Sequence, residues 1–592
     1  MKRFLAKVCG LALAGWLGLH ASTGFAEWTQ NVHFPLIGDG NAQKGGVIRY
    51  PINTFPATFR THGPSSNEAF ISMMSGLVYQ SLISIHPNTL EIIPNLADAW
   101  EIKDDNMTFL FRLNPNARWA DGKPVTPEDV VFSYELVVDP KTKDPYAADL
   151  YSRMFAKPEV VDAQTVKFVA KTLHWRNFLF CGGLEILPAH TFRGKDYLEA
   201  FNWQLPNGSG PYQLADFQKG QNIVFKRRDD FWAKEEPGYK GLYNFDQIKF
   251  SVVRDDNLEF EKFKKGEFDV YVVGVAKRWV EEMDFDKVQK GWIQKRKIFT
   301  LKPNGHSGLA VNMRRPPLDA LSVRKALAYL YNREVFMEKL FFNEYNQMYS
   351  YFPGSIYENP QNEKIRYNPE QAKALLGEAG WKERNAQGIL VKNGQPLTLT
   401  LLYYDKVLER HLTMYQEDLK KAGIELKLKL LDWSAMLKLV DERNFDLASL
   451  GWSGMQFPNP EPDYHSKYAD INQTNNITGI KDPRIDAILD AYPKMFDVKE
   501  RIAALQELDG LAYQAQPYIL GWYAPFTRVA YWDRFGMPAA YFTKTGSDDM
   551  LMLWWHDGAK DQALQAAMKT GAALAVGATE VKYWREQEGK QP

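Results

Sequence analysis

The fold of this chain is decided by residues 397–431, which run LTLTLLYYDKVLERHLTMYQEDLKKAGIELKLKLL. Apolar residues alternate over 397–401 and again over 426–430, which is the pattern of half-buried strands. Between these segments the apolar residues have helical spacing, and they are Leu408, Leu412, Tyr415 and Leu419. Gly423 is placed to end that helix. The stretch therefore predicts two parallel strands joined by a helical crossover.

The same pattern continues past residue 431. Ser434 is positioned to cap a second helix, and residues 445–451 form a short apolar run that predicts a third strand. This alternation indicates an α/β fold. Sheets of this kind bind ligands beyond the carboxyl ends of their parallel strands, where Trp433 and Trp452 follow two of the predicted strands. Both tryptophans are candidate ligand contacts, and a position in the core or between domains is an equally open alternative.

The first half of the chain gives local signals within and on either side of a mixed region at 67–207. A strand is predicted to start near Gly45 and to run toward Phe55. Thr126 followed by Pro127 predicts the start of a helix over 127–138. Further strands are predicted by the segments 222–227 and 247–253.

Length and composition narrow the class of protein. A chain of 592 residues exceeds one ordinary domain, so we expect two or more lobes. Its hydrophobic fraction of 45% and charged fraction of 24% are typical of a globular protein and exclude a disordered or fibrous chain. The 72 basic and 72 acidic residues balance, so nucleic acid is not an expected partner.

The N-terminal segment indicates export. Lys2, Arg3 and Lys7 precede an apolar run over 8–19, and the small residue Ala26 marks a cleavage point, so residues 1–26 are predicted to be a signal peptide. A retained membrane anchor is the alternative, but the run is shorter than the roughly 20 residues that span a bilayer. We therefore expect a periplasmic protein cleaved near Ala26.

The residues that enzymes require are not arranged in recognisable motifs. Cys9 leaves with the signal, and Cys181 lies in an apolar segment that favours a buried structural thiol over a nucleophile. No two histidines lie close enough for a helical zinc motif. The segments 451–455 and 305–308 fail as nucleophile elbows, and no phosphate loop is present. We expect no cofactor, no metal and no enzyme activity, although a glycosidase with acids at unrelated positions stays open.

Ordered short motifs make the chain similar to the extracellular solute-binding proteins of family 5, the periplasmic oligopeptide- and dipeptide-binding group. The motifs are YQSL (79–82), PNLA (94–97) with Trp100, the segment 119–130, GSGPY (208–212), RDDFW (228–232), 263–269, VNM (311–313) with VRKAL (323–327), 445–452 and QP (516–517). Within the family, VRDDN (253–257) with Glu259 and Phe260, and GQNI (220–223), are most similar to the Yej-type branch, which is associated with microcin C and with peptidoglycan-derived peptides.

The resemblance implies an α/β protein with the class II periplasmic-binding-protein fold, in which two lobes and an extra subdomain close around a ligand at a hinge. The implied segments are the signal peptide at 1–26, lobe I at 27–66 and 208–309, its extra subdomain at 67–207, lobe II at 310–525, and a return to lobe I with the C-terminal tail at 526–592. A monomer is expected.

The resemblance also implies a ligand site. Its ligand-binding positions are Asn53, Thr54, Phe55, Arg60, Trp433, Trp452, Ser453, Gly454, Met455 and Tyr523. Arg60 would hold a ligand carboxylate. The alternative, which is the more common one, is that Arg60 is a lone exposed arginine with no ligand role. The family places an aspartate for the ligand's α-ammonium three residues after the strand-end tryptophan, and here that position is Met455. Either a nearby acid, Glu461 or Asp463, replaces it, or the ligand lacks a free amine there.

The expected function is capture of oligopeptides or peptide-containing compounds, such as muropeptides or microcin C-like peptides, and their delivery to an inner-membrane ABC permease. A binding protein for an oligosaccharide or a metal chelate on the same fold is the alternative. A secreted hydrolase is a remote alternative, and a chemosensory role is compatible with transport.

Overall fold

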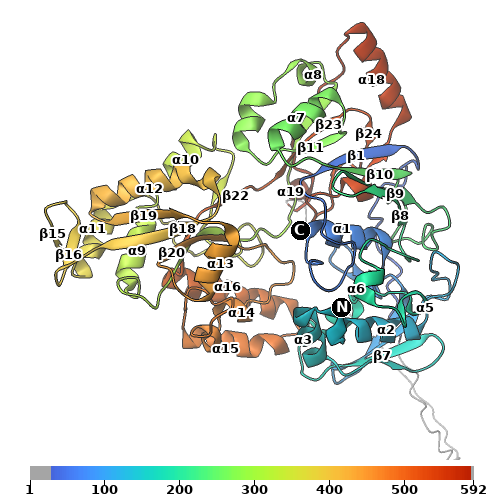
Figure 1. Cartoon of the computed structure of the whole chain (residues 1–592), viewed down its shortest axis with the longest axis horizontal. Helices are drawn as coiled ribbons and strands as arrows, with labels where there is room; N and C mark the ends of the chain where they lie inside the picture. The colour runs from blue at the N-terminus through green and yellow to red at the C-terminus, as the bar shows by residue number, and fades with distance from the viewer. Residues whose placement is uncertain (1–27, 589–592) are drawn as a thin grey trace, which may run out of the picture.

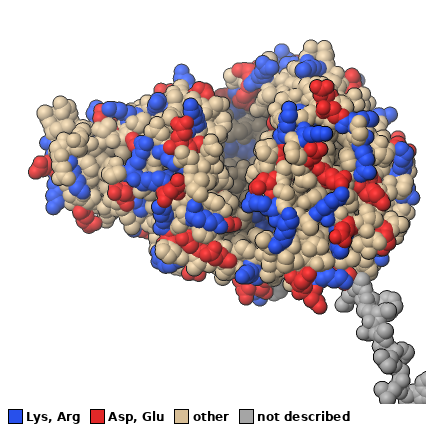
Figure 2. All heavy atoms as spheres, turned by 60° about the horizontal axis from the view of Figure 1, so that its bottom comes forward, with Lys and Arg blue, Asp and Glu red and all other residues tan. Residues whose placement is uncertain are grey.

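The computed structural model describes residues 28–588 and shows two lobes with an extra subdomain (Figure 1). The predicted signal peptide lies outside the described residues. Lobe II stands apart on the left of the view, whereas lobe I and the subdomain lie together on the right. Figure 2 shows a deep hollow between the two bodies. Charges of both signs are interspersed on the visible face.

Lobe I contains two four-stranded sheets. In the first, β1 and β10 are parallel and the other neighbours are antiparallel, in the order β1 (Val47–Ile52), β10 (Gln247–Val252), β9 (Asn222–Arg227), β8 (Tyr212–Gln218). The second has the order β11 (Val270–Val272), β23 (Thr527–Trp532), β12 (Ile293–Ile298), β26 (Glu580–Val581). The strands predicted near 47, 222 and 247 are confirmed. Two outer helices are α7 (Asp256–Lys265) and α18 (Gly558–Thr570).

The extra subdomain is built on an antiparallel sheet of order β4 (Ala97–Ile102), β5 (Thr108–Leu113), β7 (Thr165–Val169), β6 (Glu159–Val160). Its helices include α2 (Pro127–Val138), α3 (Pro145–Met154) and α4 (Asn177–Gly182). The helix α2 begins as predicted, because Thr126 and Asp129 form a reciprocal capping box. One contiguous core includes both Phe111 of this sheet and Ile248 of lobe I, so the two parts pack as one body.

Lobe II contains a five-stranded sheet of order β19 (Glu425–Leu430), β18 (Thr398–Tyr403), β20 (Leu447–Gly451), β13 (Ser307–Val311), β21 (Tyr518–Leu520). The predicted strand, helix, strand unit is confirmed: β18 and β19 are parallel, α12 (Glu409–Ala422) connects them, and Gly423 ends it in the left-handed region. β20 is also parallel to β18. Other helices of this lobe are α9 (Leu321–Tyr329), α11 (Pro369–Glu378), α15 (Pro483–Ala491) and α16 (Val498–Ala515).

One predicted helix cap is wrong. The strand β19 ends at Leu430, one residue earlier than expected, and α13 (Trp433–Asp441) begins directly at Trp433. The cap is Asp432, whose carboxylate accepts a hydrogen bond from the amide of Ala435 at 3.0 Å. A carboxylate caps a helix at least as well as a serine hydroxyl does. Its negative charge also interacts favourably with the positive end of the helix dipole.

The lobes are connected by two crossovers. The chain passes from β12 in lobe I to β13 in lobe II, and it returns from β21 and the short β22 (Trp522–Tyr523) to β23 in lobe I. The first crossover lies directly on the segment that follows β20. A Cβ on Gly305 would stand 1.5 Å from the carbonyl oxygen of Trp452, and a Cβ on Gly454 would stand 2.3 Å from that of Pro303. The crossover therefore requires glycine at both positions.

A second contact joins the subdomain to lobe II. The amide of Trp175 donates to the carbonyl oxygen of Pro493 at 2.9 Å. The Trp175 ring packs edge-on against Tyr492 and Phe457, with ring centroids 5.8 and 6.3 Å away, and the guanidinium of Arg501 lies 4.2 Å from its centroid. Lobe II is thus held to the rest of the molecule at a second place besides the crossovers.

Cys181 is buried in α4, as predicted, and burial raises the pKa of its thiol well above the ordinary value. Over residues 28–588, no helix is long and apolar enough to cross a bilayer. Nor does this part of the chain bring together three or more His, Cys, Asp or Glu side chains in a way that could hold a metal ion.

We predict that Gly305→Ala lowers the thermal midpoint of unfolding by several degrees, because the added methyl group would overlap a backbone oxygen that β13 and β20 hold in place. Differential scanning calorimetry measures the shift. The matched control is Gly377→Ala in α11, where a Cβ meets nothing within 4 Å. There we expect a neutral or slightly stabilising change, since alanine favours a helix over glycine by about 1 kcal/mol. Equal midpoints for the two variants would contradict the crossing described above.

Candidate functional site

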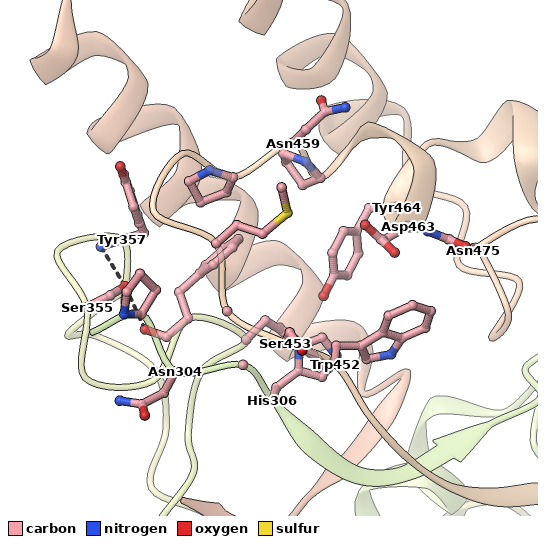
Figure 3. A pocket seen from close by; sticks show the side chains of 18 residues that line it. Asn304, His306, Ser355, Tyr357, Trp452, Ser453, Asn459, Asp463, Tyr464 and Asn475 are labelled. Atoms are coloured by element: carbon pink, nitrogen blue, oxygen red, sulfur yellow. Dashed lines mark hydrogen bonds between the residues drawn. The ribbon is translucent and has the colours of Figure 1, made fainter. Parts of the chain in front are cut away.

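A cavity of about 170 Å³ opens at the carboxyl end of β20, and we call it the Trp452 cavity. Its wall comes from the crossover at Pro303 to His306, from Tyr351 to Tyr357, and from the segment after β20. Figure 3 shows Trp452, Ser453 and Tyr464 close together, with Asp463 beside Asn475. Ligand pockets usually enclose about 300–1,000 Å³, so this cavity suits one end of a ligand better than a whole peptide.

A more open hollow of about 620 Å³ adjoins it, and we call it the hinge cavity. The two share the wall made by the crossover and by Trp452 to Gly454. The hinge cavity also includes Thr545 and Ser547, which come from the lobe I side of the cleft. Beside them, the Tyr50 hydroxyl of β1 donates to Asp548. The two cavities together form a path from lobe II toward lobe I.

Asp463 is the acidic side chain of the Trp452 cavity. Burial raises the pKa of its carboxyl group to about 7, and a hydrogen bond from Asn475 offsets only part of the shift. Within residues 28–588, no basic side chain forms an ion pair with it. Glu461, the other candidate acid, is paired with Lys467. Asp463 is therefore the carboxylate that is available to a ligand.

His306 adds a neutral polar group to the same cavity. Burial lowers the pKa of its imidazole to about 4, so the ring carries no charge at neutral pH. Its ring packs edge-on against Tyr351 and Tyr518, with centroids 5.1 and 5.0 Å away. Its Nε2 is buried and has no hydrogen-bond partner among the described residues. The cavity wall at His306 therefore carries no positive charge at neutral pH.

Five of the predicted site residues line these two cavities. Trp452, Ser453 and Gly454 line both of them, Met455 lines the Trp452 cavity, and Tyr523 lines the hinge cavity. The indole nitrogen of Trp452 donates to the Tyr518 hydroxyl at 2.9 Å, which fixes the ring. The Met455 side chain is about half exposed, so its thioether offers an apolar and adaptable surface to a ligand.

The predicted residues of lobe I are not among those that line either cavity. Asn53 and Thr54 are exposed directly after β1. The Phe55 ring packs against Trp203, Phe59 and Phe217, with centroids 5.8 to 6.4 Å away. Arg60 is buried rather than exposed, and its guanidinium donates to the Thr58 hydroxyl and to the Pro64 carbonyl oxygen. The structure therefore does not bring these four side chains to either cavity.

Trp433 is exposed and is likewise not part of either wall. Its ring stands edge-on to Tyr404, with centroids 4.9 Å apart. The residues that sequence reasoning missed are Tyr351, Tyr464 and Asn475 in the wall of the Trp452 cavity, and Tyr518, which contacts Trp452 and His306. The segment 305–308, which fails as a nucleophile elbow, supplies His306 and the crossover glycine.

The comparisons with known proteins agree with this architecture. Residues 91–475 match the family described as bacterial extracellular solute-binding proteins, family 5 Middle. The chain is 29% identical to a protein of Agrobacterium fabrum named probable peptide-binding protein YejA, over 85% of this chain and 88% of that one. It is 25% identical to the peptidoglycan-binding protein YepA of the same species, over 86% and 90%. The structure of the oligopeptide-binding protein AppA of Bacillus subtilis, solved with a nonapeptide, aligns with a TM-score of 0.68 at 24% identity, covering 87% of this chain and all of AppA.

We predict that Asp463→Asn stabilises the ligand-free protein at alkaline pH. Because folding raises the pKa of this carboxyl to about 7 from about 4 in the unfolded chain, its contribution to stability is complete below pH 4 and is lost as the pH rises through 7. Asparagine stays neutral, so the variant should gain about 1–3 kcal/mol at pH 8 and little at pH 4. Urea unfolding at both pH values measures the difference.

Glu461→Gln is the matched control, since it removes a half-exposed ion pair worth about 0–1 kcal/mol. A loss of stability in Asp463→Asn at every pH would show that the carboxylate is structurally required.

Proposed function

Since the chain belongs to the family 5 bacterial extracellular solute-binding proteins, we propose that it captures peptides or peptide-bearing compounds in the periplasm and passes them to an inner-membrane ABC permease. The observation that carries the proposal is the walled cavity at the carboxyl end of β20, which joins an aromatic surface to one unpaired carboxylate. The relatives named for peptide and peptidoglycan binding support peptides and muropeptides as the ligand class.

The Trp452 cavity would receive the amino end of the ligand. An ammonium group that enters the cavity meets Asp463, whose carboxyl ionises in response, and it meets no positive charge at His306. A buried ammonium without a carboxylate would cost several kcal/mol. Asp463 thus supplies the charge that the family's aspartate would supply at the position of Met455.

The remainder of the ligand would lie along the hinge cavity. The residues Gly451 and Ser453 are exposed there, and Trp522 and Tyr523 line the same cavity. If the backbone of the protein binds the backbone of the peptide, few contacts depend on the peptide's side chains. The protein would then accept peptides of many sequences. Closure of lobe I over the ligand would then bring the residues that follow β1 toward it, including Asn53, Thr54 and Phe55. No bond is made or broken in this cycle.

The proposal is tested first on the protein purified from the periplasm. Native mass spectrometry followed by denaturation should release a peptide or a muropeptide. An oligosaccharide or a metal chelate in its place would favour the alternative ligand classes, and hydrolysis of added muropeptides would favour an enzyme.

We further predict that a ligand with a free amine releases protons when it binds. Below pH 7 the Asp463 carboxyl is largely protonated, and an incoming ammonium ionises it, so affinity should rise with pH up to about 7. Isothermal titration in two buffers of different ionisation enthalpy measures the number of protons released. Asp463→Asn should release none and should bind about 100-fold more weakly.

The same peptide with an acetylated amine is the control ligand, and it should bind the wild type and the variant with similar affinity. If the acetylated peptide binds the wild type as tightly as the free peptide, the natural ligand carries no amine at this point and Asp463 has another role.

A further inference from the structure

A third cavity, of about 390 Å³, lies where the subdomain meets lobe II, and we call it the junction cavity. Its subdomain side includes Phe109 of β5 and Phe178 of α4. Its lobe II side includes Phe457 and Val498, the first residue of α16. Most of the other lining residues are also aliphatic or aromatic. The volume is in the range of sites that hold a whole small molecule.

The junction cavity is separate from the peptide site proposed above. It shares no lining residue with the Trp452 cavity or the hinge cavity. Met455 and Pro458 line the Trp452 cavity, whereas Phe457 between them lines the junction cavity. The Tyr492 hydroxyl donates to the carbonyl oxygen of Pro458 at 3.0 Å, which holds this dividing segment. The peptide site therefore does not account for the junction cavity.

Three exposed apolar side chains belong to the wall of this cavity, and they come from both bodies. The exposed fractions are 43% for Ile102 of β4, 42% for Phe496 and 55% for Val498. A single exposed apolar residue is ordinary on a protein surface, whereas a group of them at one cavity is typical of a binding site. An apolar ligand would remove part of this surface from water.

The cavity has a polar end beside the ring of Trp175. The guanidinium carbon of Arg501 lies 4.2 Å from the centroid of that ring, and the His174 ring centroid lies 5.8 Å from it. Both residues line the cavity. Arg501 donates to the carbonyl oxygens of Met495 and Phe496, but within residues 28–588 it forms no ion pair. Its positive charge is therefore not matched by an acid of the described chain.

His174 adds a neutral donor to the polar end. Its Nδ1 accepts a hydrogen bond from the amide of Arg176 at 3.0 Å, so the proton of the neutral ring is on Nε2. Burial lowers the pKa of the imidazole to about 4, which keeps the ring neutral at pH 7. Nε2 has no hydrogen-bond partner among the described residues. The polar end thus combines one positive charge with one N–H group.

The acid in the wall does not offset the charge of Arg501. Glu91 is exposed, and its carboxylate accepts a hydrogen bond from the Thr89 hydroxyl at 3.1 Å. An exposed carboxylate stays hydrated and is screened by salt, whereas Arg501 is partly buried against an indole ring. One uncompensated positive charge matches a monoanion. A phosphate monoester carries nearly two negative charges at neutral pH and would leave the second without a partner.

We propose that the junction cavity binds an aliphatic monocarboxylate of medium chain length, with its carboxylate at Arg501 and His174 and its chain along the apolar wall. The ligand would contact the subdomain and lobe II at the same time. The inference concerns a second site and does not rest on the proposed function.

Isothermal titration at pH 7 with sodium octanoate tests the inference. The wild type should bind one octanoate per chain. Hexanoate should bind roughly tenfold more weakly, because two fewer methylene groups are buried. Octylammonium, which has the same chain and the opposite charge, should bind at least about tenfold more weakly, because it brings a cation to Arg501.

Arg501→Met should lower the affinity for octanoate about tenfold, because it removes a charged hydrogen-bond donor. It should leave the affinity for the neutral probe 1-octanol within about twofold. If the substitution only disturbed the packing, the affinities for both probes would fall together. Arg501→Lys keeps the charge and should retain much of the octanoate affinity.

Val498→Glu is a second variant, and it leaves the packing intact because Val498 is exposed and an acid in the first turn of α16 suits the helix dipole. It should weaken octanoate binding several-fold, since the new charge opposes the carboxylate. Val407→Glu is the matched control. Val407 is a 76% exposed residue of lobe II that lines none of the three cavities, so this variant should bind octanoate as the wild type does.

Failure of the wild type to bind octanoate would overturn the inference and leave the proposed function in place. Equal affinities for octanoate and octylammonium would overturn the assignment of a carboxylate to the polar end. Octanoate binding that is unchanged in both Arg501→Met and Val498→Glu would mean that the ligand occupies another cavity, and this result would also overturn the inference.

Discussion

Two backbone segments cross at contact distance beneath the cleft, and the whole site depends on that crossing. Gly305 and Gly454 let the crossover into lobe II lie against the segment that leaves β20, and the amide of Trp452 donates to the carbonyl oxygen of His306. The residues around Gly305 and Gly454 thus connect the lobes and set the pairing register between β13 and β20. They also place His306 beside Trp452. Because hinge and cavity wall are one structure, movement of the lobes changes the shape of the ligand site directly.

The site contains two polar groups whose burial the ligand-free protein does not fully compensate. Asp463 is held at a raised pKa without a cationic partner, and His306 Nε2 is buried without a hydrogen bond. Each of these costs stability, since unpaired polar groups in a dry environment lose their hydration. A cationic ligand would supply the partner that Asp463 lacks, and part of its binding free energy would come from removing that cost.

The parts of the fold that could be predicted are those set by local pattern. The unit over 397–431 was predictable because side-chain periodicity and a terminal glycine determine it, and α2 was predictable because its capping box is local. The cap at Asp432 was missed because two good capping residues lie two positions apart, and the end of β19 decides between them. Trp452 was found from its strand end. Tyr351 and Asn475 reach the cavity, and Tyr518 reaches the Trp452 indole, through tertiary packing that no local spacing encodes.

The packing of Trp175 against lobe II has a consequence for the rate of ligand exchange. Lobe II is attached covalently at the crossovers and non-covalently at Trp175, Tyr492 and Phe457. A rigid body held at two separate places turns only about the line that joins them, so an opening that preserves both attachments follows a single axis. Any other opening first has to expose the Trp175 ring to water, at a cost of about 2–3 kcal/mol. Ligands should therefore enter and leave from one side of the cleft, and the dissociation rate should depend on how far that single rotation proceeds.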